Sequence, residues 1–217
     1  MNTAGYWLDY CVSAMQRAGL FFGHGTNNAQ DEAAWLVLHV LGAPLDSGFD
    51  DWDRVLDENA AHRLQEILRR RIAERIPLAY LIGEARFCGL DFAVTPEVLV
   101  PRSPLAELIQ ERFSPWLNIS PGDRVLDMCT GGGCIAIAIA HFLQETRVDA
   151  VDVSAAALRV AAAYRRRASG SLADALHRLR LPSYPAKSGH DLYGCLSSIL
   201  GIKPSLRSLS AAKRRRT

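Results

Sequence analysis

Several features that would place a protein in a membrane or outside the cell are missing from this sequence of 217 residues. The longest apolar run, 134–142, contains His141 and is far shorter than the roughly 18 to 20 residues of a membrane-spanning helix. The first residues include Asp9 and no basic region, so no secretory signal is expected. The cysteines are odd in number and form no C-x-x-C pair. We therefore expect a protein of the reducing cytoplasm.

Lysine is absent before residue 187, and acidic residues are nearly absent after residue 160. Residues 1–160 hold 13 Arg against 21 acidic residues, whereas residues 161–217 hold 12 basic residues against Asp174 and Asp191. All four tryptophans and all five asparagines also lie before residue 160. The two parts therefore differ in kind, and the change falls near Ala163.

The most informative stretch, 124–152, contains a short β-rich run, a glycine loop, an apolar helical pattern and a second β-rich run. This order predicts a β-loop-α-β unit. Gly131 to Gly133 allow a tight turn and close approach of a ligand, and the helix N–H groups from about Cys134 onward face the same point. Asp152 ends the second run, where a carboxylate can meet the hydroxyls of a ribose. We interpret the unit as binding a nucleoside-type cofactor.

The glycines alone do not identify the cofactor. Counting from Gly131, the sixth position is Ala136, which the small-residue variant of the dinucleotide motif G-x-G-x-x-G tolerates. Asp127, just before the loop, would repel a pyrophosphate but suits the cationic groups of S-adenosylmethionine. We therefore favour S-adenosylmethionine over a dinucleotide, and an ordinary βα turn without a ligand is a third interpretation.

Residues 1–83 show the period of amphipathic helices, which predicts a small helical domain. Its clearest helix is predicted at 57–75, before Pro77 stops the pattern. His24, between two glycines, is interpreted as a loop residue rather than a catalytic one. From residue 84 to residue 100 the period changes, which predicts a β-hairpin linker with its turn at 89–91.

Three stretches together resemble one family, the HemK-type N5-glutamine methyltransferases. Residues 87–94 read F-C-G-L-D-F-A-V and residues 98–102 read V-L-V-P-R, similar to the start of the family's catalytic domain. Residues 125–136 resemble its cofactor loop, and residues 148–158 its second strand and following helix. The resemblance covers about residues 7 to 163. It implies an α/β fold, with a helical substrate-recognition domain at 1–83 and an incomplete Rossmann-like (class I) methyltransferase domain at 101–163.

One branch of that family matches in detail. Arg102 is followed by S-P-L-A-E-L-I and Asp127 by M-C-T, similar to the enzymes that methylate a glutamine of the third protein of the large ribosomal subunit. Release-factor methyltransferases, the alternative, typically carry P-E-T-E and L-G-T-G-S-G there. The resemblance implies S-adenosylmethionine as cofactor, and that ribosomal protein or the assembling large subunit as partner. It also implies these cofactor-binding residues: Phe87, Arg102, Asp127, Cys129, Thr130, Gly131, Gly132, Gly133 and Asp152.

The family's Asn-Pro-Pro-Tyr motif, whose Asn and next carbonyl hold the substrate amide, is missing. No Asn follows Asn118, and no two prolines are adjacent. An amide nitrogen is a poor nucleophile, so it has to be held in line with the methyl group that it attacks. We therefore expect no catalytic residue in this chain and little or no methyltransferase activity.

Residues 164–217 are basic and do not continue the alternation of strands and helices. We interpret them as an atypical tail without a fixed fold, and favour a shifted reading frame as its origin. Alternatively, the K-R-R-R run at 213–216 is an RNA-binding or targeting tail, which would make the chain a noncatalytic RNA-associated or cofactor-binding protein. Within the tail, His190 to Tyr193 faintly resemble a Ser-Asp-Leu-Phe motif of the family.

Overall fold

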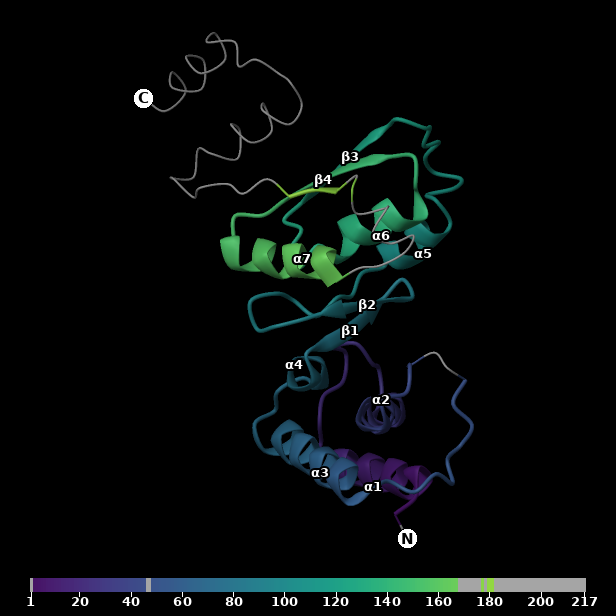
Figure 1. The fold of residues 1–217 in the computed structure, drawn as a ribbon, viewed down its shortest axis with the longest axis vertical. Coiled ribbons are helices and arrows are strands. Elements are labelled where there is room, and N and C mark those ends of the chain that lie inside the picture. Colours follow the sequence, from purple (N-terminus) through teal and green to yellow (C-terminus); the bar gives the residue numbers. More distant parts are fainter. Residues whose placement is uncertain (1, 46–47, 168–176, 178, 182–217) are drawn as a thin grey trace.

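The computed structural model describes residues 2–45, 48–167, 177 and 179–181. Helices form one end of the molecule, a two-stranded antiparallel sheet lies in the middle, and a three-stranded parallel sheet with its helices forms the other end (Figure 1). The fold is therefore mixed α/β with a helical N-terminal part, as predicted. None of the helices in the described ranges has the length and apolar character that a membrane span requires.

The helical part consists of α1 (Ala4–Arg17), α2 (Ala29–Leu41), α3 (Glu58–Ala73) and α4 (Leu78–Ile82). Side-chain oxygens cap the first three: Thr3 accepts from Tyr6 N, Asn28 from Asp31 N, and Asp57 from Ala60 N. Each of these bonds satisfies a helix N–H group that would otherwise lack a partner. The helix predicted at 57–75 is thereby confirmed.

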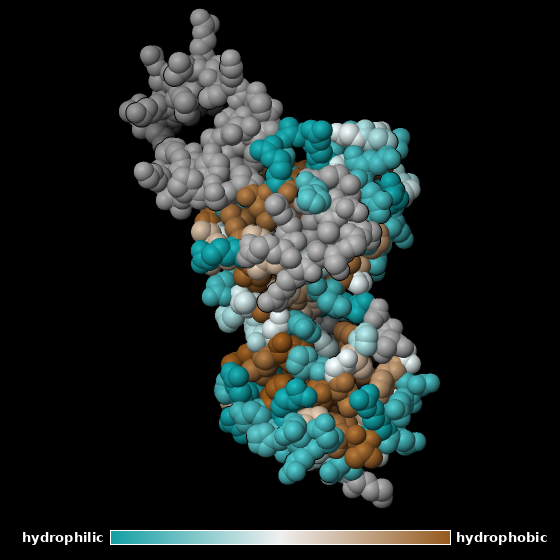
Figure 2. All heavy atoms as spheres, viewed as in Figure 1, coloured by the Kyte–Doolittle hydropathy of each residue, from teal (hydrophilic) through white to brown (hydrophobic). Residues whose placement is uncertain are grey.

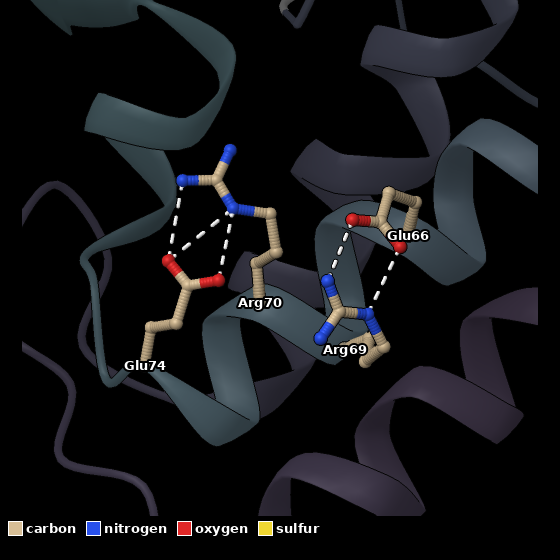
Figure 3. A network of polar contacts seen from close by, with 4 residues as sticks. All are labelled: Glu66, Arg69, Arg70 and Glu74. Carbon is tan, nitrogen blue, oxygen red and sulfur yellow. Dashed lines mark hydrogen bonds and ion pairs between the residues drawn. The ribbon is translucent and has the colours of Figure 1, made fainter.

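The core of this part takes side chains from all four helices, and its largest fully buried members are Met15, Leu36, Leu64 and Leu78. Figure 2 shows hydrophilic residues around the rim of the helical part and hydrophobic residues toward its middle. On α3, Arg69 pairs with Glu66 and Arg70 with Glu74 (Figure 3). The next residue, Arg71, instead lies inside the core.

The hairpin consists of β1 (Glu84–Phe87) and β2 (Leu90–Ala93), with Phe87 opposite Leu90. Its turn is therefore Cys88-Gly89, and the turn predicted at 89–91 is wrong. Both turn residues have positive φ, 52° and 76°, the conformation of a two-residue turn that matches the twist of the strands. Residues 98–100 form no strand, and Val98 and Val100 pack into the core of the helical part.

The second half contains α5 (Leu105–Gln110), β3 (Arg124–Met128), α6 (Cys134–Phe142), β4 (Arg147–Val151), α7 (Ala155–Arg167) and β5 (Leu179–Arg180). β4 lies between β3 and β5, and all three are parallel. Val125 pairs with Val148 and Met128 with Val151, which confirms the predicted βαβ unit. Apolar side chains of α6 and the hairpin pack into one cluster, which includes Leu179.

Regular structure continues past residue 163, where the composition changes. Helix α7 continues to Arg167, and the Tyr164 ring stacks on Phe92 with 4.6 Å between centroids. Leu179 is 1% exposed, and the guanidinium of Arg180 lies 3.4 Å from the carboxylate of Asp149. The sequence did not predict this strand, because two residues are too few to show a period. The predictions for 182–217, including 190–193 and 213–216, lie outside the described residues.

Candidate cofactor-binding site

The loop between β3 and α6 has an unusual backbone. Cys129, Gly131 and Gly133 all have positive φ, at 62°, 56° and 81°, whereas Gly132 does not. A Cβ at Gly133 would lie 3.0 Å from the Cβ of Ala161 on α7 and 3.3 Å from Ile137 Cδ1. Glycine at this position therefore lets α7 pack closely against the start of α6, a requirement of the fold rather than of a ligand.

Asp127 lies near the end of β3 and ties the loop to α6. Its Oδ2 accepts hydrogen bonds from Thr130 Oγ1 at 2.6 Å and from Ala136 N at 3.2 Å. Burial raises the pKa of Asp127, those two hydrogen bonds oppose the rise, and the charge of Asp152 adds to it. The site therefore contains a partly buried carboxylate whose charge a cationic ligand would stabilise.

Asp152 follows β4 directly and meets the loop from the other side. Its Oδ2 accepts from Gly131 N and its Oδ1 from Ser154 N, both at 2.8 Å. The loop is further attached to β4 through Thr130 N, which donates to Val151 O at 3.0 Å. Because a carboxylate has about four acceptor positions, Asp152 can keep these bonds and still accept two hydroxyl groups.

The thiols of the loop differ in environment. Cys129 is exposed, whereas Cys134 begins α6 and is partly buried. Burial, with the negative charge of Asp127 adding to it, raises the pKa of Cys134 to about 11. This thiol is therefore neutral near pH 7 and is not an activated nucleophile.

Two predicted site residues have partners outside the loop. Phe87 is buried in the apolar cluster that it forms with α6. Arg102 donates from Nη1 to Gly23 O of the helical part at 2.8 Å. The structure therefore brings together Asp127, the loop and Asp152, and gives Phe87 and Arg102 other partners.

Two contacts of the loop were not predicted. Val98 lies against Gly132, since a Cβ built at Gly132 would be 3.6 Å from the side chain of Val98. Ser154 N donates to Asp152 Oδ1 and so holds that carboxylate in place. The available signals were the V-L-V-P-R motif that contains Val98 and the Asp-Val-Ser order after β4.

The helical part, the partly buried acid near the end of β3 and the acid after β4 can be compared with known proteins. Residues 13–83 match the model of the PrmC N-terminal domain. The chain is 48% identical over 160 residues to the ribosomal protein uL3 glutamine methyltransferase of Xanthomonas campestris pv. campestris, a match covering 74% of this chain and 52% of that protein. It is 47% identical over 154 residues to the protein of the same name from Xylella fastidiosa strain Temecula1, covering 71% and 49%.

The chain is thus related to the HemK-type glutamine methyltransferases, and both of these relatives carry the uL3 name. The resemblance found in its motifs is confirmed. The chain spans about half the length of the curated relatives that it matches.

Proposed function

We propose that this chain contains the substrate-recognition domain and the cofactor-binding half of an S-adenosylmethionine-dependent enzyme that methylates a glutamine side chain of ribosomal protein uL3. The observation that carries the proposal is the position of Asp127 and Asp152 on either side of the loop, each hydrogen-bonded to it. The names of the relatives support uL3 over a release factor as the substrate.

We further propose a division into a helical domain at 1–83, a hairpin linker at 84–100 and an incomplete Rossmann-like domain from 101 onward. The parallel pairing of β3 with β4 through α6 supports this, since it is the first βαβ unit of such a domain. Because Leu179 and Arg180 pair with β4, the domain extends beyond residue 163. Cytoplasmic location follows from the proposed ribosomal substrate.

In this proposal Asp152 accepts the ribose hydroxyls, and the loop from Cys129 to Gly133 lines the cofactor. Asp127 stabilises the positive charge of the cofactor from its partly buried position near the end of β3. S-adenosylmethionine supplies a methyl group on a cationic sulfur, which an amide nitrogen can attack. What the protein contributes is the orientation of these two partners.

The half of the site that orients the amide is absent from the 217 residues, because they contain no Asn-Pro-Pro-Tyr motif. The Asn side chain and the adjacent carbonyl of that motif accept the amide N–H groups in the family. Without them, a bound cofactor meets no positioned nucleophile. We therefore propose that the chain binds cofactor but transfers no methyl group by itself.

A chimera tests the proposed function. Residues 1–163 are joined to the corresponding remainder of the Xanthomonas campestris relative, and the product is incubated with methyl-labelled S-adenosylmethionine and unmethylated large ribosomal subunits. The chimera is expected to label a glutamine of uL3, whereas the 217-residue chain leaves it unlabelled. The matched control is the chimera with Asp152→Ala, which should lose most of the activity. Label transferred by the 217-residue chain, or an inactive but folded chimera, would contradict the proposal.

A further inference from the structure

A buried ion pair holds the loop between α1 and α2. Arg71 Nε lies 2.6 Å from Glu32 Oε1, and the two side chains are 4% and 2% exposed. Arg71 Nη2 also donates to Phe21 O at 2.9 Å, while Glu32 Oε2 accepts from Thr26 Oγ1 at 3.2 Å. The pair therefore fixes both ends of the segment 21–26, from a position in the core where hydrogen-bonded partners satisfy its charges.

The middle of the same segment reaches the second half of the chain. Gly23 O accepts from Arg102 Nη1 at 2.8 Å, although 79 residues separate the two. Gly25 has a φ of 107°, and a Cβ there would lie 3.1 Å from the Trp35 ring and 3.9 Å from Val100. The segment 21–26 is therefore shaped to lie against the chain at 100–102.

The chain at 98–102 contacts the cofactor loop. Val98 O accepts from Tyr80 Oη at 2.8 Å, so the helical part holds this carbonyl as well. The side chain of Val98 lies against Gly132, the middle glycine of the loop. Two hydrogen bonds, one from Tyr80 of α4 to Val98 O and one from Arg102 to Gly23 O of the loop 21–26, thus fix residues 98–102 at the point where they contact the candidate site.

From these contacts we propose that Arg102 is a positioning residue rather than a cofactor ligand. By donating to Gly23 O, it holds the segment 21–26 against residues 98–102 and so fixes the orientation of the helical domain relative to the cofactor loop. The inference rests on the proposed function only in taking the second half as the cofactor-binding part. It replaces the role that the family resemblance implied for Arg102.

Local opening of the segment can be measured by chymotrypsin cleavage after Phe21 or Phe22 in the full 217-residue chain. Phe21 is exposed, so its susceptibility depends on how firmly the segment is held. Cleavage after the exposed Trp116 in the same digest serves as the internal reference. The variants are Arg102→Gln, Arg102→Lys and Thr26→Val. The matched control is Arg112→Gln, because Arg112 also donates to a backbone carbonyl, that of Phe142, but within the second half.

The expected result is that Arg102→Gln and Thr26→Val each raise cleavage after Phe21 and Phe22 by about fivefold or more relative to Trp116, at unchanged urea midpoint. Arg102→Lys should restore much of the protection, and Arg112→Gln should match the parent. Affinity for S-adenosylhomocysteine should stay within about twofold in Arg102→Gln. Unchanged cleavage would overturn the proposal, and so would a tenfold loss of affinity without increased cleavage, which would make Arg102 a cofactor ligand. Because cleavage needs no cofactor, a parent that fails to bind S-adenosylhomocysteine contradicts the proposed function alone.

Discussion

The carboxylate of Asp152 accepts a hydrogen bond from the backbone N–H of Gly131 at 2.8 Å, across 21 residues of chain. This bond joins the end of β4 to the loop that follows β3. Because the second oxygen accepts from Ser154 N, the carboxylate is oriented before any ligand arrives. A group oriented in advance loses little freedom on binding, which favours affinity.

Replacing Asp152 should therefore affect binding more than replacing the other acid of the same strand. Asp152→Ala removes a charge-assisted acceptor and should weaken S-adenosylhomocysteine binding by about tenfold or more, corresponding to roughly 1.5 to 3 kcal/mol. Asp149→Asn is the comparison, since Asp149 is buried against Arg124 and Arg180 instead. It should lower the free energy of unfolding and change affinity little. Equal losses of affinity in calorimetric titrations would mean that the roles of the two acids are misassigned.

The raised pKa of Asp127 predicts a pH dependence. The folded state holds a proton on the Asp127 carboxyl more tightly than the unfolded state does. The free energy of unfolding that Asp127 contributes is therefore lost as the pH rises from the ordinary pKa of the carboxyl, 3.8, through its raised pKa in the folded state. Cofactor binding, which needs the carboxylate, should instead be lost as pH falls through the raised value.

The hydroxyl of Thr130 tests that dependence, because its hydrogen bond opposes the rise. In Thr130→Val the pKa of Asp127 should rise further, and the pH at which binding of S-adenosylhomocysteine is half lost should move upward. Thr130→Ser keeps the hydroxyl and should retain the parent's midpoint. Identical midpoints for the parent and Thr130→Val would show that Asp127 does not control binding.

The strand β5 should contribute measurably to stability. Leu179 is 1% exposed within the apolar cluster of α6, so Leu179→Ala should lower the free energy of unfolding by about 2 to 5 kcal/mol. Leu99, which is 88% exposed, provides the control, and Leu99→Ala should change it by less than about 0.5 kcal/mol. Urea unfolding measures both. Similar small effects would show that residues 179–180 do not belong to the sheet.

Two neighbouring arginines of α3, Arg70 and Arg71, should differ sharply in how much they contribute to the free energy of unfolding. Arg71→Met leaves Glu32 buried without its partner and should cost about 3 to 5 kcal/mol of unfolding free energy. Arg70→Met breaks only the exposed pair with Glu74 (Figure 3) and should have little effect. Thermal and urea unfolding of the two variants provide the comparison. A stable Arg71→Met chain would mean that the buried pair is dispensable.

Local patterns were sufficient to predict the elements that depend on neighbours in sequence. The helix at 57–75, with its apolar stripe, and the βαβ unit at 124–152 both follow from periodicity and the order of local patterns. The acids at 127 and 152 were located for the same reason, since each lies at the end of a strand.

Contacts between distant segments could not be predicted in this way. Arg71 stands among exposed arginines, and only the fold brings Glu32 to it from 39 residues away. Gly23 likewise gives no sign in the sequence that its carbonyl would accept from Arg102, so this contact was not predicted. The hairpin turn was misplaced because Cys88, a residue that rarely adopts positive φ, occupies it.

The central claim is that the loop 129–133, which Asp127 and Asp152 hold from either side, binds S-adenosylmethionine and not a dinucleotide. Isothermal titration of the 217-residue chain with S-adenosylhomocysteine, and separately with NAD, tests it most directly. We expect saturable binding of one S-adenosylhomocysteine per chain, weakened at least about tenfold by Asp152→Ala, and no saturable binding of NAD. Binding of NAD in place of S-adenosylhomocysteine, or binding of neither by a folded chain, would contradict the account.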